Sequence, residues 1–235
     1  MSGHLFLVES LPDGDSYVLS GPEGHHAADV ARLRVGERLL LGDGRGGTAT
    51  AVVSAVGRSR LDLSIMDRRY EVPPEPRLVV AQGLAKGDRA ELAVQAMTEA
   101  GVDEILPWAA SRSVVIWRDG RGLERWRTTA REAAKQSHRA WLPVVSPVVS
   151  TGALAPRVTF VLDVSAAARL STVDLPAGVP ELVLVVGPEG GVAPEELAAF
   201  RRAGAVPVRL GATVLRTSTA GVAALSVLAA RLGRW

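Results

Sequence analysis

The 235-residue chain is predicted to be an α/β protein with two domains: a β-rich amino-terminal barrel, then a parallel sheet flanked by helices. Short apolar runs separated by turn residues fill the first part of the chain. Three prolines follow within residues 73–76, and beyond them strand-like apolar runs alternate with helical segments. We therefore expect domains at residues 1–72 and 77–235, joined by a linker at 73–76.

The amino-terminal domain is expected to hold several short strands. They are predicted at residues 5–8, 17–19, 38–41, 49–56 and 61–65, with a short helix near 26–33. Strands at this spacing are typical of a small barrel. The glycine pattern at residues 42–47 satisfies G-x-G-x-x-G, but a strand-like run follows it where a dinucleotide site needs a helix, so we interpret it as a hairpin turn.

The second domain is expected to alternate strands with helices. Strands are predicted at residues 78–81, 102–107, 158–164, 182–186 and 206–210, and helices at 88–100, 123–141, 194–203 and 216–232. Asp88 and Glu91 have capping-box spacing, and Pro194 stands at a helix start. Strands this uniformly apolar are buried on both faces, which favours a parallel sheet.

Composition excludes several kinds of site. The chain has no cysteine, which rules out disulfides, thiolate zinc sites and a cysteine nucleophile. Its four histidines lack the spacing of a metal site, so we expect no metal. No apolar run reaches the roughly 18 residues of a membrane span, and the first residues do not resemble a secretion signal. We expect a cytoplasmic protein without a membrane partner.

One motif is a strand followed by a glycine-rich loop. The apolar run 182–186 ends in Gly187-Pro188-Glu189-Gly190-Gly191, and Pro194 then opens a helix. Ligands of open α/β sheets sit at the carboxyl ends of strands, where glycines let the backbone approach them. An ordinary tight strand-to-helix turn is the alternative.

A second strand, loop and helix start lies at residues 210–220, and it holds a single cation, Arg216. Arg216 could be part of a site or simply pair with a carboxylate. The following segment, 220–230, carries no charge, which predicts a helix buried all round, in the core or at a subunit interface.

Basic residues are concentrated between residues 112 and 139, where the sequence has eight basic and three acidic residues. Arg127, Arg131, Lys135 and Arg139 are spaced four apart and would form one stripe along a helix. The stripe is either a solvated face or a phosphate-contacting surface. The nearby Trp126, His138 and Trp141 could stack on bases or belong to the core.

Taken together, the GPEGG…PEE and LG…VLRTSTA segments (residues 187–196 and 210–220) resemble the cofactor-binding knot of SPOUT methyltransferases. Within these, the chain is similar to the bacterial 16S ribosomal RNA (uracil-N3)-methyltransferases. Similar stretches lie at residues 82–89, 95–102 and 131–143, and in the amino-terminal pattern His26, Val30, Arg32, Gly36, Asp43 and Gly44. The chain departs from many members at Ser218, where they carry Glu, and at Leu5-Phe6-Leu7, where they begin Arg-Phe-Phe.

The resemblance implies an amino-terminal PUA-like β-barrel and a carboxyl-terminal SPOUT-type parallel sheet with a trefoil knot. It also implies a homodimer that holds S-adenosyl-L-methionine in the knot. The substrate would be one uridine of 16S rRNA in the small ribosomal subunit, methylated on N3. The alternatives are a SPOUT enzyme acting on tRNA and a non-catalytic RNA-binding or ribosome-assembly factor.

The resemblance also assigns site residues. The cofactor-binding set is Gly187, Pro188, Glu189, Gly190, Gly191, Leu210, Gly211, Val214, Leu215, Thr219 and Ala220. The RNA-binding set is His26, Arg32, Lys86, Arg127, Arg131, Lys135 and Arg139. Arg216 and Glu189 are the catalytic candidates: Arg216 cannot accept a proton but can stabilise charge on the uracil oxygens, and the N3 proton would leave to Glu189 or to solvent. The target uracil must be unpaired or extruded for its N3 edge to be reached.

Overall fold

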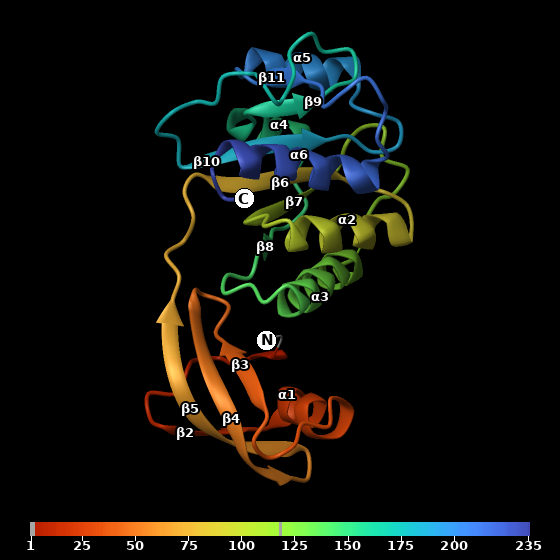
Figure 1. Ribbon diagram of the computed structural model, residues 1–235. Coiled ribbons are helices and arrows are strands. Elements are labelled where there is room, and N and C mark those ends of the chain that lie inside the picture. The colour runs from red at the N-terminus through yellow and green to blue at the C-terminus, as the bar shows by residue number, and fades with distance from the viewer. Residues whose placement is uncertain (1–2, 118) are drawn as a thin grey trace. The chain divides into compact units, whose positions relative to one another are not determined.

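The computed structural model describes residues 3–117 and 119–235, so Met1, Ser2 and Arg118 lie outside the described part. The chain divides into two compact units (Figure 1). The first consists of Met1–Pro73 and Ala134–Leu142, and the second of Pro74–Ala133 and Pro143–Trp235. The first unit therefore takes in a short segment from the middle of the chain.

The first unit is built on a five-stranded sheet. Its strands are β1 (Leu5–Leu7), β2 (Ser16–Leu19), β3 (Arg38–Gly42), β4 (Gly47–Gly57) and β5 (Arg60–Tyr70). The order is β1-β3-β4-β5-β2, and only the β1–β3 pair is parallel. Most residues of the first half of β4 alternate between buried and half-buried, so one face of the sheet packs on the core. The expected β-rich architecture is confirmed.

The helix of the first unit begins earlier than expected. Helix α1 (Gly21–His25) continues into a π-helical turn, η1 (His26–Val30), where the sequence predicted a helix near residues 26–33. Pro22 stands in the first turn of α1, where its missing N–H costs nothing. Arg32 has a φ of 55°, a left-handed conformation that ends the helical run.

The segment Ala134–Leu142 of the first unit begins in the last turn of helix α3 (Arg121–Gln136), which ends five residues short of the predicted Trp141. His138 beyond it has a φ of 53°, which a helix cannot accommodate. Lys135 is buried, and its ammonium lies 3.1 Å from the carboxylate of Glu23. The indole N–H of Trp141 donates to Glu71 O over 2.9 Å. These contacts hold the segment against α1 and against the residue that follows β5.

The second unit contains a six-stranded sheet. Its strands are β6 (Arg77–Gly83), β7 (Glu104–Trp108), β8 (Val144–Val145), β9 (Phe160–Leu162), β10 (Glu181–Val186) and β11 (Val206–Val208). The order is β11-β9-β10-β6-β7-β8, and every pair is parallel, as the apolar strands predicted. The sequence did not predict the short β8, and β9 and β11 are shorter than their apolar runs.

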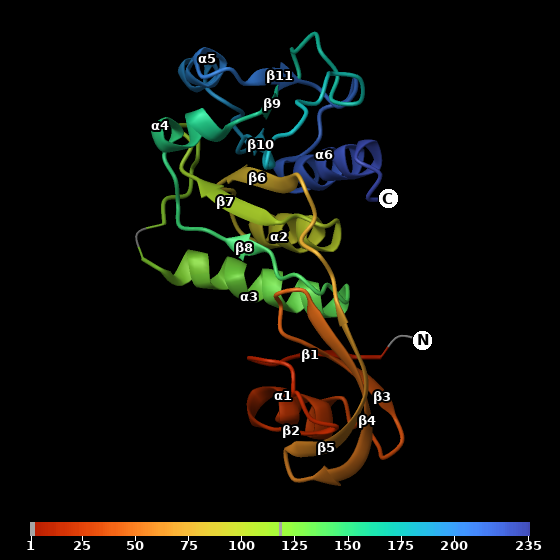
Figure 2. The same ribbon diagram turned by 90° about the vertical axis from the view of Figure 1, so that its left-hand side faces the viewer.

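Helices cover both faces of this sheet. They are α2 (Asp88–Glu99), α3, α4 (Thr151–Leu154) with the 3₁₀ turn η2 (Ala155–Arg157), α5 (Pro194–Arg202) and α6 (Thr217–Arg231). One core lies between the sheet and α2, α3 and α6, and the other between the sheet and α4, η2 and α5. Figure 2 shows α4 and α5 on one side of the strands, with α2 and α6 on the other. The α/β prediction is confirmed.

The capping-box prediction for α2 is wrong. Asp88 is the first residue of α2 and not its cap, because Gly87 precedes the helix and makes no side-chain cap bond. Glu91 instead lies 3.1 Å from the guanidinium of Arg125. Within the single chain, helix α6 buries one side: Leu225 is 1% exposed, whereas Val222 and Val227 are only partly buried. Of the two predicted locations for this helix, the core covers one side, and the subunit interface stays a prediction for the other.

Across residues 3–117 and 119–235, no helix is long and apolar enough to cross a membrane. The same residues contain no group of His, Asp and Glu side chains arranged to hold a metal ion.

Candidate methyl-donor site

A cavity of about 510 Å³ opens at the carboxyl ends of the adjacent strands β9, β10 and β11. It is lined by residues 162–164, 186–192, 208–211 and 213–217, together with Arg89 and Ala220. Parallel strands bring their following loops to one edge of the sheet, which is where open α/β proteins bind ligands. The volume lies in the range of roughly 300–1,000 Å³ that is usual for small-molecule sites.

The loop after β10 packs closely against the end of β6. A side-chain carbon on Gly83 would lie 2.5 Å from the backbone nitrogen of Pro188, a separation that real contacts do not reach. Gly191 has a φ of 71°, and its N–H donates to Pro188 O over 2.8 Å. The loop can therefore take this tight shape only with glycine at both positions.

A buried carboxylate fixes the other end of this loop. Glu196, in the first turn of α5, is 7% exposed. It accepts hydrogen bonds from the N–H of Ala193 at 3.2 Å, the N–H of Ser111 at 2.8 Å and the hydroxyl of Thr151 at 2.9 Å. Because ionised acceptors make the stronger hydrogen bonds, Glu196 is well placed to hold the end of the loop.

Gly190 lies against a neighbouring side chain as well as the cavity. A side-chain carbon there would lie 3.1 Å from Cβ of Arg112, whose guanidinium donates to Gly190 O over 3.0 Å. Gly190 also lines the cavity. A larger residue would therefore press on Arg112 on one side of the loop.

The loop after β11 leads into helix α6. Arg216 stands at the N-cap position of this helix without a side-chain cap bond, is exposed, and lines the cavity. The hydroxyl of Thr217 donates to Gly187 O over 2.8 Å and accepts from the amide of Gln82 over 2.9 Å. The start of α6 is thus joined to the strand end that opens the glycine-rich loop.

The cavity is lined by basic, acidic and aliphatic side chains. The cationic lining residues are Arg89, Arg209 and Arg216, and the acidic ones are Asp163 and Glu189. Glu189 Oε1 accepts the backbone N–H of Lys86 at 3.3 Å. Leu162, Val186, Val208 and Leu210 add aliphatic surface. Such a site suits a ligand with a flat apolar part and charged ends.

The structure brings most of the predicted cofactor residues together. All of them line the cavity except Thr219, which is exposed in the first turn of α6 and donates its hydroxyl to Arg216 O. Both catalytic candidates also line it. The sequence interpretation missed the loop after β9, along with Arg89, Arg209 and Thr217. The rule that ligands sit at the carboxyl ends of strands could have pointed to residues 162–164.

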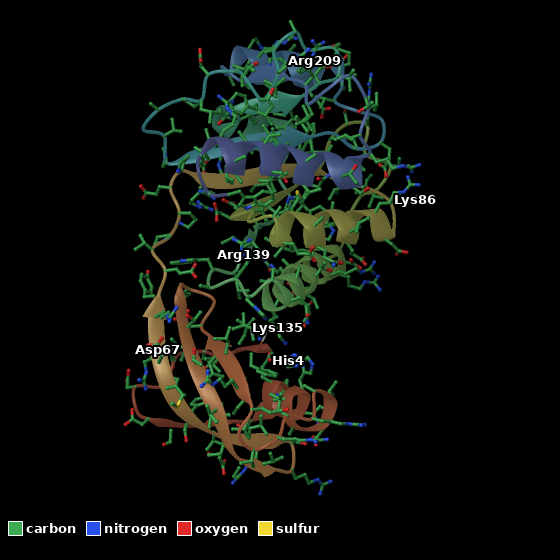
Figure 3. The ribbon with its side chains drawn as sticks, in the orientation of Figure 1. His4, Asp67, Lys86, Lys135, Arg139 and Arg209 are labelled. Carbon is green, nitrogen blue, oxygen red and sulfur yellow. The ribbon has the colours of Figure 1, made fainter. Side chains whose placement is uncertain are left out.

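The predicted RNA-binding residues are spread over both units. Lys86 projects outward near the start of α2 (Figure 3), and Arg127 and Arg131 are exposed on α3. His26 packs its ring edge-on against Phe6, with centroids 5.9 Å apart, while Arg32 is exposed. Arg139 is half-buried and Lys135 is buried on Glu23. A buried lysine cannot reach a phosphate at the surface, so we leave Lys135 out of the RNA-contacting set.

Replacing Gly83 with Ala is expected to weaken ligand binding while the protein stays folded. The added carbon would push the backbone of Pro188 away and displace the loop of residues 187–191. We expect the dissociation constant for S-adenosylmethionine to rise at least about tenfold, which corresponds to about 1.4 kcal/mol. Isothermal titration calorimetry measures this change. Gly152→Ala is the control, since nothing lies within 4 Å of its added carbon. Unchanged affinity in a folded Gly83→Ala variant would show that this packing does not shape the site.

Known proteins match both parts of the chain. The RNA methyltransferase domain family matches residues 73–229, and the RNA methyltransferase PUA domain family matches residues 19–66. The ribosomal RNA small subunit methyltransferase E of Mycobacterium tuberculosis is 48% identical over 100% of this chain and 94% of its own length. The enzyme of the same name from Bacillus subtilis is 30% identical over 94% of this chain and 92% of its own.

A solved structure is similar over the same extent. The ribosomal RNA small subunit methyltransferase E of Neisseria gonorrhoeae, bound to S-adenosyl methionine, has a TM-score of 0.87 and 28% identity, and covers 98% of each chain. The fold, the loops around the cavity and these matches agree. The chain therefore belongs to the RNA methyltransferase family in which a PUA domain precedes the methyltransferase domain, the family of the ribosomal RNA small subunit methyltransferases E.

Proposed function

We propose that this chain transfers a methyl group from S-adenosyl-L-methionine to N3 of one uridine in the 16S rRNA of the small ribosomal subunit. The observation that carries the proposal is the cavity at the carboxyl ends of β9, β10 and β11, lined by the glycine-rich loop and by Arg216. It is supported by relatives that are ribosomal RNA small subunit methyltransferases and by a similar structure bound to S-adenosyl methionine. Such a substrate would place the protein in the cytoplasm.

The residues of the cavity fit this cofactor. Leu162 and Leu210 offer an apolar surface to an adenine ring, and Asp163 and Glu189 offer carboxylates to hydroxyl and ammonium groups. The close packing of Gly83 on Pro188 lets the loop backbone face the cavity. The cofactor supplies a methyl group already activated by its sulfonium, so the protein has chiefly to align donor and acceptor.

Arg216 and Glu189 perform the remaining chemistry. As uracil loses its N3 proton, negative charge spreads to the two flanking oxygens, and the guanidinium of Arg216 stabilises it without taking a proton. Glu189 accepts the proton or passes it to solvent. The backbone N–H of Lys86 holds Oε1 of Glu189, which leaves the second carboxylate oxygen for this role. The chain has no cysteine, so the covalent route to carbon-5 methylation is closed, in accord with a nitrogen target.

Exposed arginines would bring the RNA to this site. Arg127 and Arg131 lie one turn apart on the exposed face of α3, where they can contact backbone phosphates. The target base must be unpaired or extruded to present its N3 edge. The trefoil knot implied by the resemblance stays a prediction.

The Arg216→Ala variant is expected to lose catalysis but keep the cofactor. Removing one charge-stabilising donor lowers kcat by about a hundredfold or more, because it acts on charge that exists only in the transition state. We expect the affinity for S-adenosylmethionine to stay within about threefold, equal to about 0.7 kcal/mol. The measurement is transfer of tritiated methyl groups to small ribosomal subunits, with Arg201→Ala as a control on the exposed end of α5.

The same assay separates the alternatives. Methyl transfer to tRNA in preference to small subunits would overturn the rRNA assignment. Cofactor binding without transfer to any RNA would favour a non-catalytic assembly factor. A full rate in Arg216→Ala would remove this residue from the chemistry.

Neutralising Arg127 and Arg131 together is expected to flatten the salt dependence of RNA binding. Each phosphate contact to single-stranded RNA contributes about 0.7 to the slope of log K against log salt, so the slope should fall by about 1.4. Filter binding of the Arg127→Gln, Arg131→Gln variant at several salt concentrations measures it. Arg201→Gln with Arg202→Gln is the matched control, since both are exposed on α5. An unchanged slope would make the α3 arginines an ordinary solvated face.

We also propose that the protein is a homodimer that uses α6. Val222 and Val227 are only partly buried on a helix without charge before Arg231. Leu225 lies in the core, so Leu225→Glu is expected to unfold the protein, whereas Val227→Glu should give a folded monomer. Sedimentation equilibrium at micromolar concentration checks the mass. A parent protein that sediments as a monomer would contradict the proposal.

A further inference from the structure

Three elements of the second unit meet at one buried hydroxyl. Thr217 is the first residue of α6 and is 8% exposed. Its hydroxyl donates to Gly187 O, at the end of β10, over 2.8 Å, and it accepts the side-chain amide of Gln82, near the end of β6, over 2.9 Å. The sequence interpretation assigned no role to either Gln82 or Thr217.

The surroundings of Gln82 leave its side chain little freedom. Gln82 is 0% exposed and pairs in register with Val186, the residue before Gly187. Its amide N–H groups donate to Thr217 and to Gly83 O, the latter over 3.2 Å. A side-chain carbon on Gly221 would lie 2.6 Å from the sulfur of Met97 and 3.5 Å from Oε1 of Gln82, so α6 lies close against β6.

We propose that Gln82 and Thr217 are positioning residues for S-adenosylmethionine and for Arg216. The inference rests on the proposed function and deepens it. The hydrogen bonds Gln82–Thr217–Gly187 join the two loops that line the cavity, one after β10 and one after β11. They fix the first turn of α6, and Arg216 is the residue directly before that turn.

The hydroxyl of Thr217 makes this connection through a single atom. A threonine hydroxyl has one hydrogen to donate and lone pairs to accept with, and both capacities are used here. Valine has the same branched shape but no hydroxyl. Both Gly187 O and the side-chain amide of Gln82 would lose their hydrogen bond to residue 217 in a dry interior. A buried polar group that loses its partner is costly, so the two loops would separate to admit water. The cavity would widen, and Arg216 would move with the helix start.

The test compares Thr217→Val with Thr217→Ser by titration calorimetry with S-adenosylmethionine. We expect the dissociation constant to rise about tenfold in Thr217→Val, because binding would have to bring the separated loops back together at a cost of about one buried hydrogen bond. Thr217→Ser keeps the hydroxyl and should stay within about twofold of the parent. Thr98→Val is the matched control: Thr98 is also buried on a helix of this unit, and its hydroxyl donates to Val94 O. It should lose stability without losing affinity.

A second readout separates positioning from a merely structural role. At saturating cofactor, the single-turnover rate of methyl transfer in Thr217→Val should be about tenfold below that of the parent protein. The rate should return to the parent value in Thr217→Ser, because Arg216 is displaced only in the valine variant. Gln82→Leu should act in the same direction, and its effect should not add to that of Thr217→Val, because both break one chain of bonds.

Several outcomes would overturn the inference. They are affinity of Thr217→Val within about twofold of the parent, equal losses in Thr217→Val and Thr217→Ser, and additive effects of the Gln82 and Thr217 variants. Each of these leaves the proposed function standing if the parent binds S-adenosylmethionine. A parent that binds no S-adenosylmethionine would instead overturn the proposed function itself.

Discussion

Glycine at position 83 lets the loop of residues 187–191 lie directly on the end of β6, and the cavity depends on that contact. With any side chain at Gly83, the backbone of Pro188 would have to move. Gly187 O would then leave the hydroxyl of Thr217, and the start of α6 would lose its connection to β10. The three strand ends form one site because their loops are packed backbone to backbone and joined by few polar contacts.

The same contacts explain why a short glycine-rich loop can serve catalysis. Glu196 accepts three hydrogen bonds at the far end of the loop, and Arg112 donates to Gly190 O from outside. Held at several points, the loop has little conformational entropy left to lose when a ligand binds, so more of the binding energy is available to orient the reactants. Arg216 and Glu189 both line the cavity, and we assign to them the stabilisation of charge and the removal of the N3 proton.

The sequence predicted the parallel sheet and most of the cavity because those features follow from local patterns. Apolar runs marked the strands, and the segments 187–191 and 210–220 carried a recognisable resemblance. Contacts between distant residues were not predictable in this way. Nothing in the sequence indicated that Lys135 would be buried on Glu23, 112 positions away, or that Gln82 would reach Thr217. Helix ends were also missed where a left-handed residue such as His138 decides them.

Hydrogen–deuterium exchange with and without S-adenosylmethionine tests most directly whether the loops after β9, β10 and β11 form one cofactor site. The account predicts that the ligand slows exchange in residues 162–164, 187–192 and 209–217 together, because all three segments line the cavity. Exchange in residues 3–73 of the first unit should not change. Protection that spared the 187–192 loop, or that appeared in only one of the three segments, would contradict a site built from these strand ends.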